Sequence, residues 1–259
     1  MEIITSRQNS FVKKLIALDN KKYRDEYGEF IIEGENFVFL SKEDISFYCF
    51  SETYYNQERW KKYISADNNI IVITDELFEK IADTVNPQGV LAVAKKRNIN
   101  LSSLLNNKEN PFFVVAENLN DPGNLGTVIR TADASGADGV ILLKGCVDVY
   151  NKKVVRAAAG SISNIPIVTE ASGLETLNLL KKNNILLLST HLKGNVYPYY
   201  IDLTKGCAII IGNEATGLSE SLTKETDFLV KLPMKGNAES LNVSVATGIL
   251  LYEVLRQRL

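Results

Sequence analysis

The sequence predicts two α/β domains joined by a short linker. From Phe112 onward, short apolar runs alternate with amphipathic segments of helical length, a pattern typical of a parallel sheet with helices on both faces. Residues 1–97 also mix strand-like runs with helical stretches, and residues 98–110 are rich in asparagine and serine, as linkers often are. We therefore expect a small α/β domain at 1–97 and a parallel-sheet domain at 111–259.

The predicted strands of the first domain are EFIIEG, ISFYCF and NIIVIT, which begin at Glu29, Ile45 and Asn69. Each is a short run with β-branched or aromatic residues, and polar or charged helical stretches separate them. The second domain contains six such runs, namely FFVVAE, GVILL, PIVT, ILLLST, CAIIIG and FLVKL. Its last segment, 242–259, has apolar residues at helical spacing and ends in basic residues, which predicts a C-terminal helix.

The net charge of the chain bears on how it could bind a polyanion such as nucleic acid. Its 259 residues carry a formal net charge of -2, so no global positive field surrounds the protein. Basic residues nevertheless cluster near the N-terminus and at the end of the first domain. These clusters are either solvated helix faces or local contacts for nucleic acid. Their members are Lys13, Lys14, Lys21, Lys22, Arg24, Lys95, Lys96 and Arg97.

Cysteine and histidine usage narrows the chemistry. Cys49, Cys146 and Cys207 are odd in number and far apart, which fits neither a disulfide framework nor a zinc-ligand set. His191 is the only histidine, so we expect no multi-histidine metal site. The opening segment lacks the apolar stretch of a signal peptide, and every apolar run is too short to cross a bilayer. We expect a cytoplasmic protein that binds neither metal nor membrane.

Three loops that follow predicted strands have unusual composition, and ligands gather beyond the carboxyl ends of strands in such sheets. The first loop turns at 121–123, after which we expect Asn124 to cap the next helix. Arg130 lies four residues after Gly126, so we expect its guanidinium to reach over bare backbone near the helix start. A cation there is unfavourable unless it meets a negatively charged ligand. The alternative is a capped helix with a surface arginine.

The second and third loops offer further ligand-binding features. In IIIGNEATGLS, Gly212 permits a ligand to approach the main chain, and Asn213 and Glu214 supply polar groups. In LPMKGNAESLNVSVA, we expect Ser240 or Asn242 to cap the last helix. Taken singly, the second loop is better explained as an ordinary turn and the third as a helix cap. None of the three loops matches the dinucleotide or Walker phosphate patterns.

Taken together, in this order and spacing, NLNDPGNLGTVIRTA, IIGNEATGLS and LPMKGNAESLNVSVA resemble the three signature motifs of the SpoU/TrmH branch of the SPOUT methyltransferases. The resemblance covers the segment from Phe112 to Leu259. The N-terminal third resembles the RNA-binding substrate domain of many members, on SRQNSFVKKL, KKYRDEYGEFIIEGENFV and NPQGVLAVAKK. The resemblance of the three motifs implies that the second domain contains a deep trefoil knot. It also implies that this knot forms the binding site for S-adenosyl-L-methionine.

The resemblance also implies a set of site residues. Positions expected to hold the methyl donor are Thr190, Gly212, Asn213, Leu232, Met234 and Leu241. Positions expected to act in catalysis and substrate positioning are Asn124, Arg130, Glu214, Ser240 and Asn242. Positions expected to contact RNA are Arg156 and, from the N-terminal cluster, Lys13, Lys22 and Arg24. Two positions depart from the family pattern: Ala215 stands where a glycine is usual, and Ala157 where a serine is usual.

The implied reaction moves a methyl group from the donor's sulfonium to a ribose 2′-hydroxyl of RNA. It is an in-line displacement in which positioning supplies much of the acceleration. In the family, the arginine of the first motif, here Arg130, has been proposed as the base. Because a guanidinium stays protonated in proteins, we favour Arg130 as an electrostatic stabiliser of the developing alkoxide. Both roles stay open here.

The resemblance favours ribosomal RNA as the substrate, because members with this N-terminal extension are often ribosomal. The alternatives are a transfer RNA ribose methyltransferase and a non-catalytic RNA-binding protein on the same scaffold. A dinucleotide-dependent oxidoreductase is disfavoured because the first strand-loop-helix unit lacks G-x-G-x-x-G. Family members pair through the knotted domain, and the final helix is apolar over more than one face. We therefore expect a homodimer.

Overall fold

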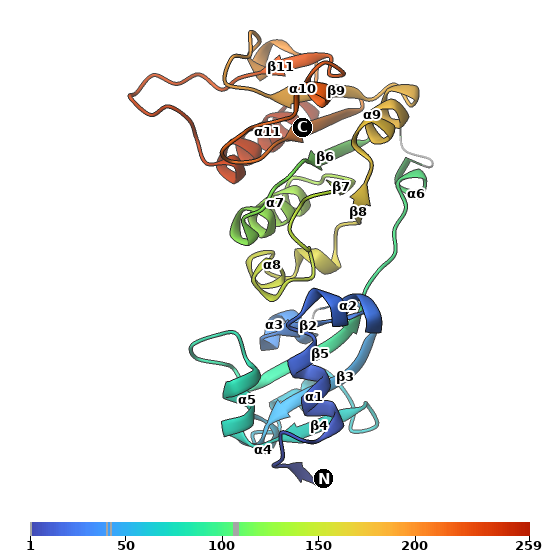
Figure 1. Cartoon of the computed structure of the whole chain (residues 1–259), viewed down its shortest axis with the longest axis vertical. Helices are drawn as coiled ribbons and strands as arrows, with labels where there is room; N and C mark the ends of the chain where they lie inside the picture. The colour runs from blue at the N-terminus through green and yellow to red at the C-terminus, as the bar shows by residue number, and fades with distance from the viewer. Residues whose placement is uncertain (1, 40, 42, 106–108) are drawn as a thin grey trace. The chain divides into compact units, whose positions relative to one another are not determined.

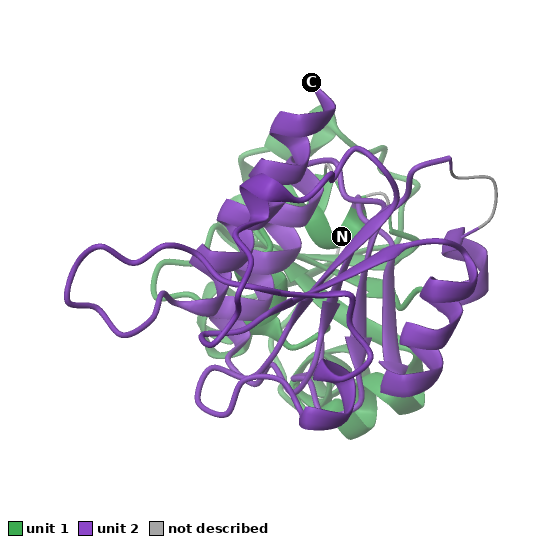
Figure 2. Ribbon diagram, turned by 90° about the horizontal axis from the view of Figure 1, so that it is seen from above, with its two compact units in different colours: residues 1–97, 150–163 green, residues 98–149, 164–259 purple. Residues whose placement is uncertain are grey.

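The computed structural model describes residues 2–39, 41, 43–105 and 109–259. The chain divides into two compact units, coloured separately in Figure 2. The first contains residues up to 97 together with 150–163, and the second contains 98–149 and 164–259. Residues 150–163 therefore pack with the N-terminal part of the chain, although they follow the second strand of the C-terminal sheet.

The first unit is built around a five-stranded mixed sheet of order β1-β4-β3-β5-β2. β4 pairs in parallel with β1 and β3, whereas β5 pairs antiparallel with β3 and β2. The predicted strands correspond to β2, β3 and β4, and the sequence reading did not include β1 and β5. The bounds are β1 (Ile3–Ile4), β2 (Glu29–Glu33), β3 (Ile45–Ser51), β4 (Ile70–Ile73) and β5 (Val90–Lys95).

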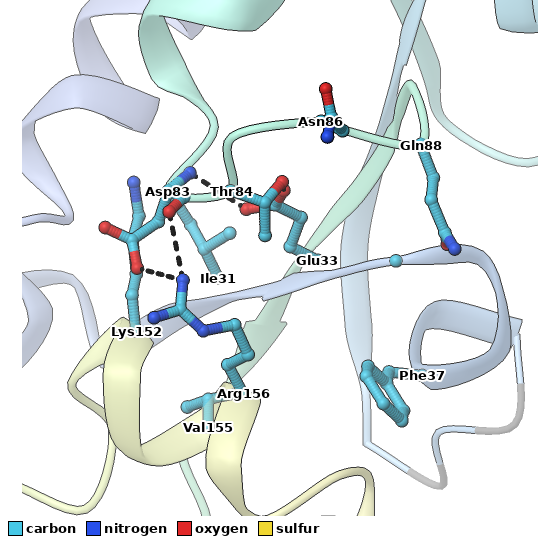
Figure 3. A pocket seen from close by; sticks show the side chains of 11 residues that line it. Ile31, Glu33, Phe37, Asp83, Thr84, Asn86, Gln88, Lys152, Val155 and Arg156 are labelled. Atoms are coloured by element: carbon cyan, nitrogen blue, oxygen red, sulfur yellow. Dashed lines mark hydrogen bonds and ion pairs between the residues drawn. The ribbon is translucent and has the colours of Figure 1, made fainter. Parts of the chain in front are cut away.

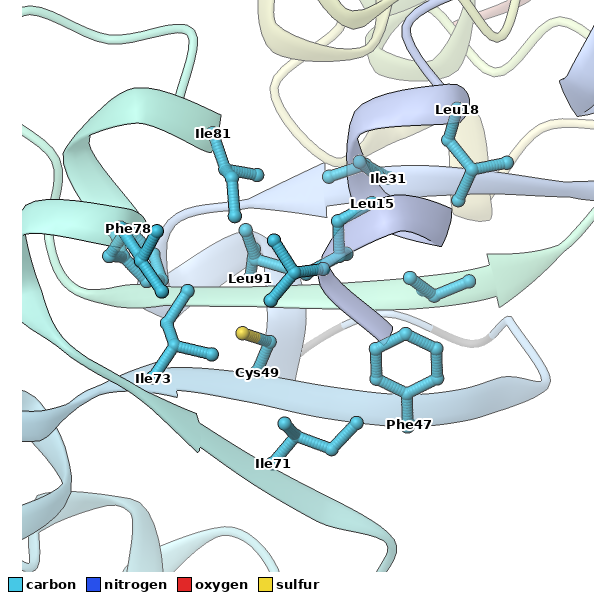
Figure 4. Packing of buried hydrophobic residues seen from close by; sticks show 13 residues of the cluster. Leu15, Leu18, Ile31, Phe47, Cys49, Ile71, Ile73, Phe78, Ile81 and Leu91 are labelled. Carbon is cyan, nitrogen blue, oxygen red and sulfur yellow. The ribbon is translucent and has the colours of Figure 1, made fainter. Parts of the chain in front are cut away.

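The helices of the first unit are short. Helix α1 covers one face of the sheet, because Val12 and Leu15, three residues apart, are fully buried. They pack in one core with Ile31, Phe47 and Cys49 (Figure 4). The bounds are α1 (Ser10–Ala17), α2 (Lys21–Tyr27), α3 (Glu35–Phe39), α4 (Glu52–Asn56), η1 (Arg59–Lys62), α5 (Asp75–Ile81), α8 (Lys152–Ala157) and η2 (Ser161–Ser163).

The second unit contains a six-stranded sheet of order β11-β9-β10-β6-β7-β8, in which every pairing is parallel. Its strands correspond to the six apolar runs of the sequence, so the predicted parallel sheet is confirmed. The bounds are β6 (Phe112–Ala116), β7 (Gly139–Leu143), β8 (Ile167–Ala171), β9 (Leu186–Thr190), β10 (Cys207–Ile211) and β11 (Phe228–Val230).

Helices cover both faces of this sheet (Figure 1). On one face, Leu104, Leu180 and Leu222 of three helices share a core with Phe113. On the other, α11 packs against α7 and β10, and the Arg258 guanidinium lies 5.4 Å from the ring centre of Phe112. The helices are α6 (Leu101–Leu105), α7 (Pro122–Ala134), α9 (Gly173–Lys182), η3 (Pro198–Tyr200), α10 (Glu220–Thr223) and α11 (Val243–Arg258). Within the described ranges, no helix has the length and apolar character needed to span a membrane.

Candidate functional site at the carboxyl edge of the parallel sheet

Four neighbouring strands of the second unit release their loops at one edge of the sheet. Ala116 at the end of β6 lies opposite Ile211 at the end of β10, and Thr190 at the end of β9 lies opposite Val230 of β11. Because the strands are parallel, the loops that follow them begin side by side. The three signature loops and Thr190 are therefore placed at the same edge.

The first loop leads into α7 through a cap that differs from the expected one. The helix begins after Asp121, whose side chain accepts a 2.7 Å hydrogen bond from the backbone N–H of Asn124. Asp121 is therefore the N-cap, and the expectation that Asn124 caps this helix is wrong. The reason is that Pro122 takes the first helical position, where its missing N–H costs nothing. The Asn124 side chain stays available for other contacts.

Asn124 joins all three loops through its amide. Its Nδ2 donates to Glu214 Oε1 at 3.0 Å, and its Oδ1 accepts from Asn242 Nδ2 at 2.9 Å. Asn242 also caps α11, because its Oδ1 accepts from the backbone N–H of Ser244 at 2.9 Å. One hydrogen-bonded chain thus runs from the last helix through the first loop to the second. Asn242 sets the orientation of the Asn124 amide, and that amide in turn holds the Glu214 carboxylate in place.

The second loop folds back tightly on itself. Asn213 and Gly217 exchange backbone hydrogen bonds of 3.1 and 2.9 Å. A Cβ on Gly212 would lie 2.3 Å from the backbone carbon of Gly217, so only glycine fits there. The Asn213 side chain supports the loop, since its Oδ1 accepts from the N–H of Ala215 and its Nδ2 donates to the Asn118 carbonyl at 2.9 Å. Alanine at 215 is thus compatible with this turn.

Two residues that the sequence reading missed hold the second loop to the first. The Glu117 carboxylate accepts a 2.7 Å hydrogen bond from the backbone N–H of Ser219. Asn118 has a φ of 51°, in the left-handed region, and its carbonyl receives Asn213. Their position could have indicated this role, because both residues follow directly after a predicted buried strand, where the first loop begins.

The other predicted cofactor residues lie at the end of β9 and in the third loop. Thr190 is half-buried, and its hydroxyl donates to the Ile210 carbonyl at 3.3 Å. Leu232 is half-buried at the start of the third loop, whereas Met234 and Leu241 are 38% and 37% exposed. The loop from β11 to α11 extends away from its unit (Figure 1, orange to red). It leaves two large apolar side chains open to a ligand.

Ser240 and Arg130 lie outside the hydrogen-bonded chain. The Ser240 hydroxyl is exposed and makes no hydrogen bond within the described part of the chain; Asn242, not Ser240, is the cap of α11. Arg130 is exposed on α7, and among the described residues it has no ion pair. It sits in the third turn, and Gly126 is buried. The expectation that Gly126 leaves bare backbone at the helix start is therefore wrong, and the reach of the Arg130 guanidinium toward the loop stays a prediction.

The four predicted RNA contacts lie in the first unit, and one of them needs correction. Arg24 is only 3% exposed, and its guanidinium donates to the carbonyls of Leu18 and Asp19, both at 2.8 Å. It terminates α1 and is not accessible to RNA. Lys13 and Lys22 are exposed. Arg156 is partly exposed, and its guanidinium donates to Asp83 Oδ2 at 2.7 Å.

Comparison with known proteins identifies relatives of both parts of the chain. Residues 111–252 match the SpoU rRNA Methylase family, and residues 9–92 match the MRM3-like substrate binding domain. The chain is 32% identical to the 23S rRNA (guanosine(2553)-2′-O)-methyltransferase RlmP of Bacillus subtilis, over 98% of this chain and 99% of that one.

Solved structures agree along the whole chain. An AdoMet-bound rRNA methyltransferase from Sinorhizobium meliloti superposes with a TM-score of 0.87 at 32% identity, covering 100% of this chain and 98% of the other. The SpoU methyltransferase AviRb from Streptomyces viridochromogenes, in complex with AdoMet, has a TM-score of 0.86 at 28% identity, covering 97% and 98%.

The fold and the linked loops define a class of α/β protein in which three loops meet at one edge of a parallel sheet and form the candidate ligand site. Within that class, the chain belongs to the SpoU rRNA methylase family. The resemblance on the three loop motifs is thereby confirmed.

Proposed function

We propose that this chain transfers the methyl group of S-adenosyl-L-methionine to a ribose 2′-hydroxyl of ribosomal RNA. The observation that carries the proposal is the hydrogen-bonded chain from Asn242 through Asn124 to Glu214. It brings polar groups of three distant motifs to one point at the carboxyl edge of the sheet. The names of the relatives, RlmP and the two AdoMet-bound enzymes, support the donor and the acceptor.

The residues at this edge fit the methyl donor. The missing side chain of Gly212 lets the Gly217 backbone fold back against it, and this tight turn stands directly beyond the end of β10, which pairs with β9. Half-buried Leu232 and the exposed side chains of Met234 and Leu241 supply apolar surface for an adenine ring. When bound there, the donor supplies the activated methyl group. The chain's part is to hold it and to place the acceptor.

The mechanism rests on groups that the fold leaves free. Arg130 has no anionic partner among the described residues, so its guanidinium can clamp a phosphate and stabilise the developing alkoxide, while the hydroxyl proton passes to that phosphate or to water. We assign it that role because a guanidinium does not release its proton at ordinary pH. The second oxygen of Glu214 has no hydrogen bond within the described ranges. It is suited to accept a hydrogen bond from a ribose hydroxyl.

We also propose a division of labour along the chain. Residues 1–97 would bind RNA and 111–259 would carry catalysis, a division supported by the two family matches; of the expected linker 98–110, residues 101–105 form α6 and pack on the second unit. Because 150–163 pack with the first unit, Arg156 joins Lys13 and Lys22 on the RNA-binding side.

All three cysteines are free, and burial raises the pKa of the Cys207 thiol to about 11. Free cysteines are compatible with the cytoplasmic location that we propose.

The trefoil knot belongs to the proposal as well. β11 lies at the edge of the sheet beside β9, whereas the following α11 packs against β10 and α7. The chain must therefore turn back across its own neighbours after Val230. A return of this kind is a requirement for a knot, although knots oppose the general rule for protein chains.

A purified-component assay tests the function directly. The protein is incubated with labelled S-adenosyl-L-methionine and unmodified ribosomal or transfer RNA, and the RNA is digested to nucleosides. We expect label in a 2′-O-methylnucleoside from ribosomal RNA. Label only from transfer RNA would support the first alternative, and RNA binding without any transfer would support a non-catalytic binder.

We expect a homodimer, with α11 in the interface. Val245, Ile249 and Tyr252 recur at helical spacing and are 52%, 40% and 52% exposed, while Leu251 and Val254 on the same helix are fully buried. A helix with apolar side chains on its outer face needs a second partner.

Light scattering at micromolar concentration should give about twice the 28.8 kDa chain mass. The double variant V245E/I249E should give the monomer mass, because dimerisation would bury two charges per chain. Leu174→Glu, at an apolar position 47% exposed on α9, is the matched control and should stay dimeric. A fully active wild-type monomer would contradict the expectation.

We expect methyl transfer to be independent of metal ions. The described residues contain no group of three His, Cys, Asp or Glu side chains that could hold a metal, and the displacement needs no Lewis acid. Activity in EDTA at constant ionic strength should equal that without chelator. The RNA fold is checked by its melting curve. Loss of activity with intact RNA, reversed by a divalent ion, would contradict this prediction.

A further inference from the structure

A pocket of about 200 Å³ lies within the first unit (Figure 3). It is bordered by the turn from β2 into α3, by the segment 83–88, and by one side of α8. Figure 3 places Phe37 and Arg156 on opposite sides, with Asn86 and Gln88 along a third. Of the residues that line this pocket, only Arg156 has been given a role above, as a proposed RNA contact.

The charged groups of the pocket neutralise one another. Arg156 donates to the Asp83 carboxylate at 2.7 Å and to its carbonyl at 2.9 Å. Glu33 accepts from the backbone N–H of Asp83 at 3.0 Å. Lys152 forms an ion pair with Asp19 and donates to a backbone carbonyl. Two cations and two carboxylates line the pocket, so its local charge is balanced. Such a lining disfavours a free phosphate or another strongly charged ligand.

The remaining side chains that line the pocket are uncharged. The Asn86 amide makes no hydrogen bond to any described residue, and Gln88 uses its Oε1 for the backbone N–H of Glu35 at 2.8 Å, which leaves its Nε2 without an acceptor. The Phe37 ring is half-buried and is paired with no other ring of the described chain. Ile31 contributes a buried apolar wall. The pocket therefore combines an aromatic face, an apolar wall and unused amide groups.

These properties match one planar, neutral heteroaromatic ring system with donors and acceptors on its edge. The volume lies below the roughly 300–1,000 Å³ of ordinary small-molecule sites, so a whole nucleotide or the methyl donor does not fit. We propose that this pocket binds a single unstacked nucleobase of the RNA substrate, with its face on Phe37 and its edge on Asn86 and Gln88. This inference depends on the proposed function in one respect, namely that the substrate is RNA. Recognition of splayed-out bases by stacking and amide contacts is typical of RNA-binding proteins.

The test measures RNA binding without the methyl donor. Labelled seven-nucleotide RNAs, A7, C7 and U7, and an abasic seven-mer with the same backbone are titrated with the full chain by fluorescence anisotropy. Wild type should bind one base-bearing RNA at least about tenfold more tightly than the abasic strand. Phe37→Leu should weaken that binding about tenfold, because the stacking face is lost. Phe37→Leu should leave binding of the abasic strand unchanged.

Asn86→Ala serves as the second variant, because Asn86 is exposed and unpartnered and its loss should not impair folding. It should reduce the preference between the three bases. Tyr63→Leu, at an aromatic position 49% exposed in the same unit but outside the pocket, is the matched control and should bind as wild type does. Equal binding by wild type and both pocket variants, or no difference between base-bearing and abasic strands, would overturn the proposal. Methyl transfer is assayed separately, so an active enzyme with unaffected pocket variants would refute only this inference.

Discussion

Arg130→Ala should lower the rate of methyl transfer by about a hundredfold or more and leave the affinity for S-adenosyl-L-methionine nearly unchanged. Arg130 is exposed on α7 and has no ion pair within the described part of the chain. Its loss therefore removes a free positive charge from the acceptor side without breaking a structural contact. Donor affinity is measured by calorimetry, and the rate at saturating donor by label transfer to RNA.

Two further variants separate charge from geometry. Arg130→Lys keeps the charge but not the planar fork that grips a phosphate in two places, so we expect only partial recovery. Lys182→Ala removes another exposed cation of the second unit, on α9, and should retain full activity. Loss of donor binding in Arg130→Ala with a normal rate at saturating donor would reverse the assignment.

Gly212→Ala should weaken binding of S-adenosyl-L-methionine by at least about tenfold, which is roughly 1.4 kcal/mol. The new Cβ would lie 2.3 Å from the backbone carbon and 2.4 Å from the carbonyl oxygen of Gly217. Because these are backbone atoms, the turn must open and lose the mutual hydrogen bonds of Asn213 and Gly217. Calorimetric titration with the donor gives the affinity.

Gly248→Ala is the control for this substitution. Its Cβ would meet Thr131 at 3.5 Å, an ordinary contact, in the interior of α11. Donor affinity should be unchanged, and helix propensity should favour folding slightly. Equal affinity in Gly212→Ala and wild type would mean that the second loop does not hold the donor.

Much of the fold follows from local patterns. β6, β7 and β10 of the second unit are apolar runs that are buried throughout, which predicts a parallel sheet, whereas the edge strands β8 and β11 are only partly buried. β1 escapes such reading because it has only two residues, Ile3 and Ile4, and is held by pairing with β4 far along the chain. The packing of 150–163 with the first unit has the same cause, since it depends on long-range contacts and not on local pattern.

The candidate site was predictable in its motifs but not in its contacts. Spacing placed Asn124, Glu214 and Asn242 in three separate loops, and only the fold shows them joined by hydrogen bonds. The predicted role of Asn124 as a cap was wrong because α7 begins at Pro122, so that Asp121, directly before it, is the N-cap and accepts from the Asn124 N–H. Arg24 looked like part of a basic surface, but its guanidinium is buried against α1.

The most direct test of the central claim is a map of 2′-O-methylated nucleotides in ribosomal RNA from cells with and without the gene. The comparison includes a strain that carries only the Arg130→Ala variant. We predict that one modification disappears in the deletion strain, returns with the wild-type gene, and stays absent with the variant. Identical maps in all of these strains would contradict the assignment of this protein as a ribosomal RNA 2′-O-methyltransferase.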